Sequence, residues 1–368
     1  MSSNKLKVLL VSDMSEVGGT EIATYISAKE LQPRVDYISV IGKKGPLSTK
    51  IADLGIEHFE GESHSINPFK SLNYVRKIRK IINEKNINVI HAQMARPVPL
   101  IWLAKSLSKN RGLKIVWTSR GLKSTTYPRI LPIFNKLNIK CLGNCKQEQQ
   151  KLIRFGVNSE NTGYVYNAYR LNPQTAVRTK LNRDFITIGT LSALRDDRRV
   201  DLFIDIAKLL LKDNPFSKSI NFLIGGDGPA KVKLEQLARS YGIQDYITFV
   251  GNVEDVEHFM QQLNVYVSPI IVRKDSGAGL SNSIVEAMIT KTPVCAYSAA
   301  AIGEIVINDY SGWLVEPGNT SDMVDAITKC INNPEIARSY VENAYQLIID
   351  QCDPKNYADK LIKYYQEL

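Results

Sequence analysis

The sequence predicts an α/β protein made of two domains, each built on a parallel β-sheet. Its 368 residues exceed the size at which a single hydrophobic core stops growing. Short apolar runs alternate with helical patterns in two separate series along the chain. Strands separated by helices imply parallel sheets with right-handed crossovers. We therefore expect two Rossmann-like domains that face each other across a cleft.

The first series of elements occupies residues 1–172. A helix that runs to Leu31 follows the first expected strand, and residues 69–85 have the apolar spacing of an amphipathic helix. The expected strands are short apolar runs, at 7–12, 35–41, 89–92, 115–118 and 141–144.

The second series predicts a second domain over residues 173–353. Its expected strands lie at 185–189, 221–224, 246–250, 265–268, 293–297 and 312–315. The final helix, over 354–368, follows the second domain in the chain but could pack back on the first.

Composition indicates a globular protein of the reducing cytoplasm. Hydrophobic residues make up 44% of the chain, and no window reaches the roughly 18 uninterrupted apolar residues of a membrane-spanning helix. The apolar run after the N-terminus lacks a small-residue cleavage site, so we interpret it as a strand rather than a signal peptide. The five cysteines are sparse and odd in number, which favours free thiols over disulfides or zinc.

The charge is unevenly distributed. Residues 1–170 contain 27 Lys and Arg against 12 Asp and Glu, whereas residues 171–368 contain 20 against 25. The basic half suggests an anionic partner, and the candidates are phospholipid headgroups and nucleic acid. We do not expect nucleic acid, because no DNA- or RNA-binding motif accompanies the charge. Within 120–140, basic and apolar residues interleave, which suits either an interfacial segment or a buried helix with a solvated basic face.

The most informative stretch is 263–288, where an apolar run leads through a glycine-containing loop into a helix near Ser281 and Asn282. The first N–H groups of a helix lack internal partners and carry partial positive charge, so this junction attracts phosphate. Gly279 lets the main chain approach a ligand closely. Glu286, one turn into the helix, could accept hydrogen bonds from both hydroxyls of a ribose. Loop and helix together suit a nucleotide diphosphate.

Three further loops follow expected strands. Gly18 and Gly19 open the first helix, where open α/β sheets bind ligands, although tight turns use paired glycines equally often. Gly226 occupies a parallel position in the second half. Arg195 and Arg198 lie beyond the first strand of the second domain, beside acidic residues; they could bind phosphate or form a surface ion-pair cluster.

Two residues at strand ends of the first domain are candidate catalytic residues. His91 ends a strand, where a lone histidine is more often structural than catalytic. Arg120 follows the next strand and could reach a donor phosphate or sugar. No triad, paired-cysteine or metal-ligand spacing supports hydrolase or metalloenzyme chemistry.

Taken together, these loops resemble glycosyltransferase family 4, the retaining, nucleotide-sugar-dependent enzymes of the GT-B fold. The resemblance covers essentially the whole chain, in order. Its motifs are GGTE at 18–21, VIHA at 89–92, TSRG at 118–121, YVYNAY at 164–169, IGTLSALRDDRRVD at 188–201, LIGGDGP at 223–229, FVGNVEDV at 249–256, GLSNSIVEAM at 279–288 and SGWLVEPGN at 311–319.

The resemblance implies that the C-terminal domain binds the nucleotide sugar and the N-terminal domain the acceptor. Glu286 matches the family glutamate that holds the ribose, and Arg198 lies where the family places a phosphate-binding lysine. The backbone amides that would take the diphosphate belong to Leu280, Ser281, Asn282, Gly18 and Gly19. Three positions depart from the family pattern, namely Ala278 for a glutamate, Thr190 for an arginine and Arg120 for a histidine.

The function we expect from this resemblance is transfer of a sugar, with retention, from a UDP- or GDP-sugar to a glycan or lipid-linked acceptor in cell-surface polysaccharide or lipopolysaccharide synthesis. The nucleotide sugar is a co-substrate, and neither cofactor nor metal is expected. The basic N-terminal half suggests a cytoplasmic protein held peripherally at the inner face of the plasma membrane. The alternatives are a non-catalytic partner subunit and a nucleotide-sugar epimerase.

Overall fold

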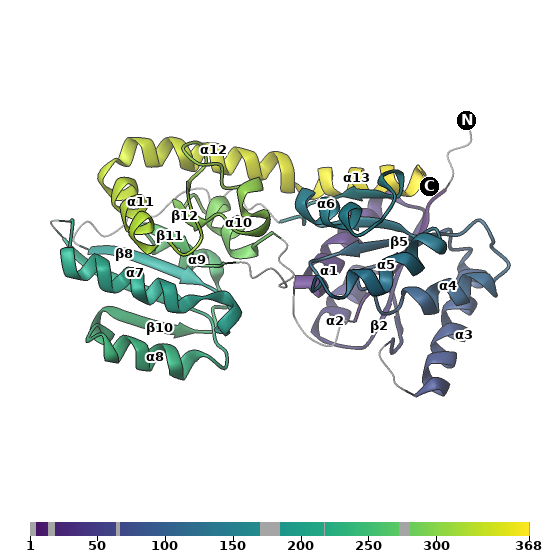
Figure 1. The fold of residues 1–368 in the computed structure, drawn as a ribbon. Helices are drawn as coiled ribbons and strands as arrows, with labels where there is room; N and C mark the ends of the chain where they lie inside the picture. Colours follow the sequence, from purple (N-terminus) through teal and green to yellow (C-terminus); the bar gives the residue numbers. More distant parts are fainter. Residues whose placement is uncertain are drawn as a thin grey trace. The chain divides into compact units, whose positions relative to one another are not determined.

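The computed structural model describes residues 5–13, 19–63, 67–169, 185–216, 218–271 and 280–367. The chain forms two compact units (Figure 1). The first combines Met1–Arg170 with Cys352–Leu368, and the second is Leu171–Gln351. Each unit has one parallel β-sheet covered by helices, as the sequence predicts.

The sheet of the first unit has seven strands among the described residues, in the order β3-β2-β1-β4-β5-β6-β7. Every ladder in it is parallel. The order reverses between β1 and β4, so the loops that leave these two strands diverge. The strands are β1 (Lys7–Val11), β2 (Tyr37–Gly42), β3 (Glu57–Glu60), β4 (Val89–Ala92), β5 (Lys114–Ser119), β6 (Lys140–Gly143) and β7 (Thr162–Tyr164).

Local sequence signals set the helices of this unit. In α3, the Asn67 side chain caps the first turn by accepting from the Phe69 N–H at 2.9 Å, and Pro68 occupies the first helical position. The helix ends at Asn86, whose φ of 55° is left-handed. The helices are α1 (Gly19–Leu31), α2 (Pro46–Asp53), α3 (Pro68–Lys85), α4 (Val98–Ser106), α5 (Tyr127–Lys136), α6 (Lys146–Arg154) and α13 (Pro354–Gln366).

The final helix, α13, belongs to the first unit although it comes last in the chain. Four of its side chains are buried in the core that also contains Val8 and Leu10 of β1; they are Tyr357, Ala358, Leu361 and Tyr365. The Tyr357 hydroxyl lies 2.6 Å from the Ser27 hydroxyl of α1. The apolar face of α13 therefore completes one side of the first sheet.

The second unit has a six-stranded parallel sheet among the described residues, ordered β10-β9-β8-β11-β12-β13. The strands are β8 (Phe185–Leu191), β9 (Ser219–Gly225), β10 (Ile247–Gly251), β11 (Val265–Ser268), β12 (Val294–Tyr297) and β13 (Trp313–Val315). The helices are α7 (Val200–Asp213), α8 (Lys231–Ser240), α9 (Val256–Gln261), α10 (Asn282–Ile289), α11 (Thr320–Asn332) and α12 (Pro334–Cys352).

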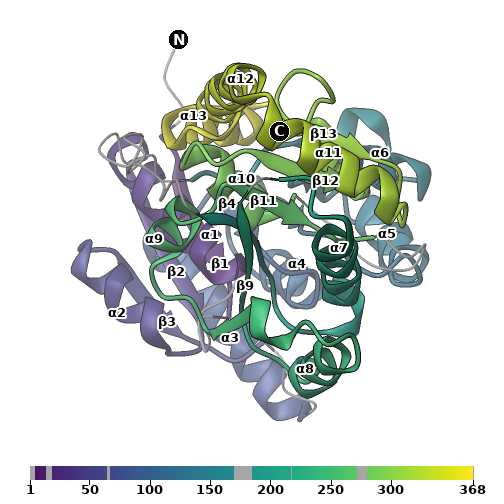
Figure 2. The same ribbon diagram turned by 90° about the vertical axis from the view of Figure 1, so that its left-hand side faces the viewer.

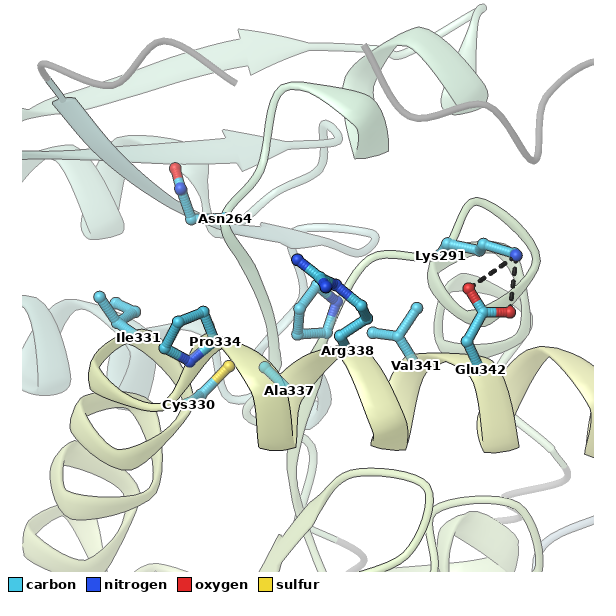
Figure 3. Close-up of a pocket in the computed structure, with 10 residues that line it drawn as sticks. Asn264, Lys291, Cys330, Ile331, Pro334, Ala337, Arg338, Val341 and Glu342 are labelled. Atoms are coloured by element: carbon cyan, nitrogen blue, oxygen red, sulfur yellow. Dashed lines mark hydrogen bonds and ion pairs between the residues drawn. The ribbon is translucent and has the colours of Figure 1, made fainter. Parts of the chain in front are cut away.

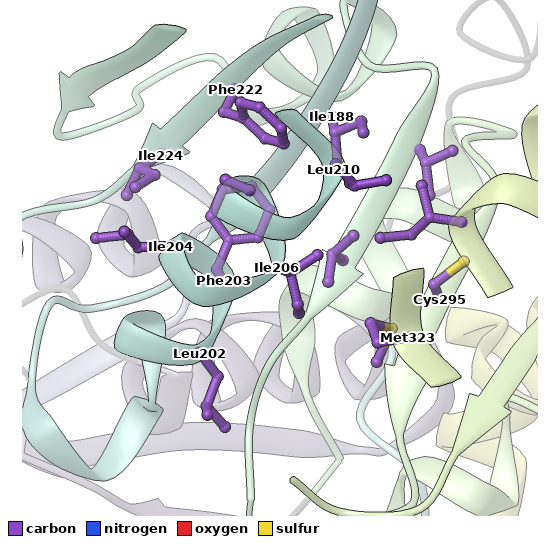
Figure 4. Close-up of a cluster of buried hydrophobic side chains, with 14 of the residues drawn as sticks. Ile188, Leu202, Phe203, Ile204, Ile206, Leu210, Phe222, Ile224, Cys295 and Met323 are labelled. Atoms are coloured by element: carbon purple, nitrogen blue, oxygen red, sulfur yellow. The ribbon is translucent and has the colours of Figure 1, made fainter. Parts of the chain in front are cut away.

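The core of the second unit lies between its sheet and the helices α7, α8 and α11 (Figure 2). Phe203 of α7 and Phe222 of β9 meet edge to face, with ring centroids 6.0 Å apart (Figure 4). Burial of each such side chain stabilises the fold by about 1.5–3 kcal/mol. This packing fixes the strand ends from which the site loops leave.

All of the predicted strands are present, with ends within two residues of the prediction. Two strands were not predicted, β3 and β7. The β3 sequence, Glu57–Glu60, carries charge at both ends of an edge strand, and β7 has only three residues.

Candidate functional site

The sheet of the second unit has its topological switch point between β8 and β11, where the strand order reverses. Open α/β sheets bind ligands outside the carboxyl ends of the strands at such a point. Arg195 and Arg198 follow β8, and the chain after β11 leads into α10, which carries Glu286. The topology therefore brings these three predicted site residues to one edge of the sheet.

The start of α10 has no side-chain cap among the described residues. Ser281 occupies the N-cap with extended backbone, but its side chain makes no capping hydrogen bond. Its hydroxyl instead lies 3.2 Å from the hydroxyl of Ser283. Helix N-termini attract negatively charged groups through their first N–H groups and the positive end of the dipole, so the prediction of a phosphate site here stands.

Glu286 lies in the second turn of α10, half-buried. Within the described part of the chain its carboxylate has no hydrogen-bond or ion-pair partner, and burial raises its pKa to about 7. A carboxylate that is desolvated without a partner is costly unless a ligand supplies donors. The arrangement fits the ribose-binding role predicted for Glu286.

Tyr266 is a site residue that the sequence did not reveal. Its fully buried hydroxyl donates to Ser283 Oγ at 2.7 Å and lies 3.4 Å from the carbonyl oxygen of Leu191. It therefore joins the end of β8 to the first turn of α10. Its pKa is raised by burial and also by the charge of Glu286. The only signal in the sequence was a phenol inside an otherwise apolar strand.

The arginines beyond β8 differ in their partners. Arg195 forms a two-pronged ion pair with Asp197 at 2.9 Å, and Arg199 does the same with Asp201. Among the described residues, Arg198 makes only a 3.7 Å ion pair with Asp197, and it is half-buried; burial and the charge of Arg195 lower its pKa. The ion-pair interpretation thus describes Arg195 and Arg199, whereas phosphate binding by Arg198 stays a prediction that its weaker pairing allows.

Gly226 has a structural requirement of its own. Its φ is 117°, and a Cβ at this position would lie 1.9 Å from the carbonyl oxygen of Ser192. The next residue, Asp227, accepts a hydrogen bond from the Gly228 N–H at 2.7 Å, so it holds the turn. Close packing of the loops after β8 and β9 accounts for the glycine, and ligand binding by Gly226 stays a prediction.

The remaining predicted phosphate-binding residues are placed as follows. Gly18 and Gly279 lie outside the described residues, as does Ala278. Gly19 is the first residue of α1. Leu280 is buried, Ser281 is the α10 N-cap and Asn282, at the first helical position, is exposed.

His91, in β4, is fully buried. Its Nδ1 lies 2.7 Å from the Tyr365 hydroxyl of α13, and its Nε2 lies 2.7 Å from Thr118 Oγ1. Burial, with a contribution from the charge of Arg120, lowers its pKa to about 3, so the ring is neutral. Both nitrogens are engaged away from solvent, which favours the structural interpretation of His91 over the catalytic one.

Arg120 lies at the carboxyl edge of the first sheet, directly after β5. Its Nη1 donates to Asn167 Oδ1 and its Nη2 to Gln93 Oε1. Gln93 directly follows β4, and Asn167 follows β7. The guanidinium is thus oriented by two amide side chains that were not predicted as site residues.

Comparison with known proteins identifies the family. Residues 7–151 match the model of the glycosyl transferase 4-like domain, and residues 173–347 match that of the glycosyl transferases group 1. The chain belongs to the family 4-like glycosyltransferases. The family resemblance predicted from the sequence is confirmed.

Individual relatives of this glycosyltransferase chain are distant. It is 26% identical over 174 residues to the poly(ribitol-phosphate) alpha-N-acetylglucosaminyltransferase of Staphylococcus aureus, an alignment that covers 47% of this chain and 34% of that protein. It is 22% identical to the N-acetyl-alpha-D-glucosaminyl L-malate synthase of Bacillus anthracis, over 99% of this chain and 96% of that protein. Three curated relatives, including the first, are aligned over only 34% to 46% of their own length.

Among solved structures, Anabaena HepE in complex with UDP has a TM-score of 0.83 to this chain at 18% identity, with 99% of this chain and 100% of that chain covered. This likeness shows the fold. The two parallel-sheet units are those of the GT-B fold, as predicted.

The basic segment 120–140 of the glycosyltransferase chain contains α5. Its apolar residues Tyr127, Leu131 and Phe134 are buried in the core, while Arg129 and Lys136 are exposed. The segment therefore contains a helix with a buried apolar face and a solvated basic face. Ile133 of the same helix is exposed, so the interfacial interpretation stays a prediction. No helix in the described ranges is long and apolar enough to span a membrane.

A cavity of about 480 Å³ lies elsewhere in the second unit (Figure 3). It is lined by Asn264 and Pro293, which directly precede β11 and β12, and by Cys330 of α11. At its rim, Lys291 forms an ion pair with Glu342 at 2.7 Å. Because it lies at the amino ends of the strands, this cavity is separate from the candidate site at their carboxyl ends.

Proposed function

We propose that the protein is a retaining glycosyltransferase that uses a UDP- or GDP-sugar. Its acceptor would be a glycan or lipid-linked glycan of cell-surface polysaccharide or lipopolysaccharide synthesis. The observation that carries this proposal is the switch-point site of the second unit. There, the start of α10, the buried carboxylate of Glu286 and the guanidinium of Arg198 lie at one edge of the sheet, and among the described residues Glu286 has no hydrogen-bond or ion-pair partner.

Each of these groups has a distinct role in the proposal. The Glu286 carboxylate accepts hydrogen bonds from the ribose hydroxyls of the donor. The N-terminal amides of α10 and the Arg198 guanidinium bind the diphosphate and stabilise the negative charge that it gains as the sugar–oxygen bond breaks. Because these groups supply the positive charge, the transfer is proposed to need neither metal nor cofactor.

Related proteins support the donor and acceptor classes. Anabaena HepE has been crystallised with UDP and with UDP and glucose. Relatives include the S. aureus poly(ribitol-phosphate) enzyme and a lipopolysaccharide core mannosyltransferase of Rhizobium leguminosarum. A donor that is a nucleotide sugar and an acceptor that is a surface glycan agree with both.

The charge of the first unit supports an acceptor at an anionic surface. The basic half of the sequence belongs to this unit, and its α5 presents Arg129 and Lys136 to solvent. We propose a cytoplasmic protein that associates electrostatically with the inner face of the plasma membrane, without inserting an apolar segment. Flotation with anionic vesicles at low salt, lost at high salt, is expected; no flotation at either salt concentration would contradict the association.

The donor is tested by binding. The purified chain is titrated calorimetrically with a panel of UDP-, GDP- and ADP-sugars, and each is compared with its free sugar. We expect one nucleotide sugar to bind, and Glu286→Ala to abolish measurable binding. Glu254→Ala serves as the control, since Glu254 is exposed on a loop of the same unit. Donor affinity retained in Glu286→Ala would contradict the ribose assignment.

The reaction is tested by its product. Incubation with the bound donor and a set of glycan and lipid-linked acceptors should yield a glycoside whose anomeric proton coupling matches that of the donor. Inversion at the anomeric carbon would contradict the retaining mechanism. A chain that binds the donor but neither transfers nor hydrolyses it would be a non-catalytic subunit, and a changed sugar on the nucleotide would indicate an epimerase.

A further inference from the structure

A second cluster of polar side chains lies at the carboxyl edge of the first sheet. Four neighbouring parallel strands each end in one polar residue of this cluster. These residues are Gln93 after β4, Arg120 after β5, Asn144 after β6 and Asn167 after β7. Parallel strands place their carboxyl ends on one edge, so these four residues lie along that edge although they span 75 residues of sequence.

Among the described residues, no carboxylate forms an ion pair with the guanidinium of Arg120. Its guanidinium donates to two neutral amide oxygens, Asn167 Oδ1 and Gln93 Oε1, and it also interacts with the phenol of Tyr357. The charge of Glu21 raises the pKa of Arg120, against the lowering by burial. Within the described residues, no ion pair involves this guanidinium. A buried charge without a counter-ion is costly, so its retention calls for a ligand.

Three atoms of the cluster are buried without a hydrogen-bond partner in the part of the chain that the structure describes. They are Arg120 Nε, Gln93 Nε2 and Asn144 Oδ1. Gln93 and Asn144 are only 2% and 3% exposed, so solvent does not readily satisfy them. Buried polar groups in native proteins are normally paired, and unpaired ones at a single edge indicate a missing partner. The two nitrogens can only donate and the amide oxygen can only accept.

We propose that the first unit binds an acceptor with an anionic group, a phosphate or a carboxylate, close to a hydroxyl. The anionic oxygens accept hydrogen bonds from Arg120 Nε and Gln93 Nε2, and the hydroxyl donates to Asn144 Oδ1. A guanidinium fork matches the geometry of both anions. In calling this ligand the acceptor, the inference rests on the proposed transferase function.

The test compares matched neutral and anionic probes by NMR titration of the full chain. Glycerol 1-phosphate is paired with glycerol, and glucuronate with glucose. We expect wild type to bind at least one anionic probe about 10-fold more tightly than its neutral partner. The pair with the larger difference distinguishes phosphate from carboxylate. Equal affinity within both pairs would overturn the proposal.

Variants locate the effect. Arg120→Gln should lose the preference for the anion, whereas Arg129→Gln, which changes an exposed arginine on α5, should keep it. Gln93→Glu supplies an internal carboxylate to the guanidinium, so it should raise the melting temperature and abolish anion binding. Gln93→Glu tests anion binding at Arg120 even if Arg120→Gln does not fold. Unchanged anion binding in Gln93→Glu would overturn the proposal.

The outcome is distinguishable from that of the proposed function. Nucleotide-sugar binding is measured on the same samples, and Arg129→Gln should retain it because Arg129 is exposed on α5, outside the predicted site. Wild type that binds the nucleotide sugar without any anion preference refutes only this inference. Wild type that prefers the anions but binds no nucleotide sugar refutes the proposed donor instead.

Discussion

The phenol of Tyr266 in β11 donates a 2.7 Å hydrogen bond to the hydroxyl of Ser283 in the first turn of α10. The same phenol lies 3.4 Å from the carbonyl oxygen of Leu191, at the end of β8. One buried side chain therefore connects the two strands of the switch point to the helix that is proposed to hold the diphosphate. The start of α10 is positioned from within the core.

Tyr266→Phe should weaken nucleotide-sugar binding by about 3–10-fold, because the first turn of α10 loses its tie to the sheet. Stability should fall by about 1 kcal/mol. Tyr297→Phe is the matched control, since the buried Tyr297 hydroxyl in the neighbouring strand has no hydrogen-bond partner in the described structure. Calorimetry and urea unfolding measure both effects, and equal behaviour of the two variants would contradict this role for Tyr266.

Glu286 should make nucleotide binding pH-dependent. Burial raises its pKa to about 7 in the free protein, and ribose hydroxyls stabilise the ionised form. Affinity should therefore fall as the pH is lowered through about 7, approaching 10-fold per pH unit. Glu286→Gln should bind weakly at every pH and lose this dependence. A wild-type affinity that is flat between pH 5.5 and 8 would refute the expectation.

The same carboxyl group should destabilise the folded protein at high pH. Its pKa in the folded protein, about 7, lies above the ordinary value of 4.5. The free energy of unfolding therefore falls as the pH rises between these two values. At pH 8, Glu286→Gln should be more stable than wild type by about 1–3 kcal/mol in urea unfolding. At pH 4, where the group is protonated in both states, the difference should largely vanish; a constant difference would point to another cause.

Arg198 and its neighbour Arg199 should differ in their effect on the donor. Arg198→Gln should weaken nucleotide-sugar binding by about 10–100-fold, because a charge-assisted contact to phosphate is lost. Arg199→Gln should leave it unchanged, because Arg199 is engaged by Asp201 through bonds of 2.9–3.1 Å. Calorimetric titration decides, and similar losses in both variants would contradict the phosphate assignment.

His91 should make the free energy of unfolding fall at acidic pH. Its pKa is lowered to about 3 by burial, against an ordinary 6.5, so the unfolded chain takes up a proton that the folded chain excludes. The neutral ring contributes fully to the free energy of unfolding above pH 6.5. This contribution is lost as the pH falls toward 3, and the free energy of unfolding then falls by up to about 1.4 kcal/mol per pH unit. His91→Gln should show a shallower slope in urea unfolding between pH 4 and 6.5. Identical slopes would contradict this.

Much of the fold could be predicted from the apolar runs of the sequence and from their spacing. Strands buried on both faces, such as β4 and β11, appear as continuous apolar runs, and their ends agreed with the prediction to the residue. The edge strand β3 was not predicted, because its sequence EHFE lacks an apolar run. Its ladder to β2 is fixed by backbone pairing and by Tyr37, whose hydroxyl bonds Glu57 at 2.6 Å.

Site residues could be predicted where a charged residue lies in or just after a loop that follows a strand. Glu286 and Arg198 were found in this way. Gln93 and Asn167 were not predicted, although Asn167 lies in a family motif and Gln93 directly follows one. An amide side chain can be assigned to a site only when its hydrogen-bond partner is known, and the sequence does not show that partner. Only the fold brings the ends of β4, β5 and β7 together around Arg120. Tyr266 was hidden because core and site residues share one strand.

The return of α13 to the first unit has a consequence for biosynthesis. Tyr357, Leu361 and Tyr365 belong to a core whose other members, such as Leu10, leave the ribosome some 350 residues earlier. The half made first therefore cannot seal its interior until α13, Pro354–Gln366, has also left the ribosome. A nascent chain should show an independently protease-resistant second half before the first half gains the same resistance.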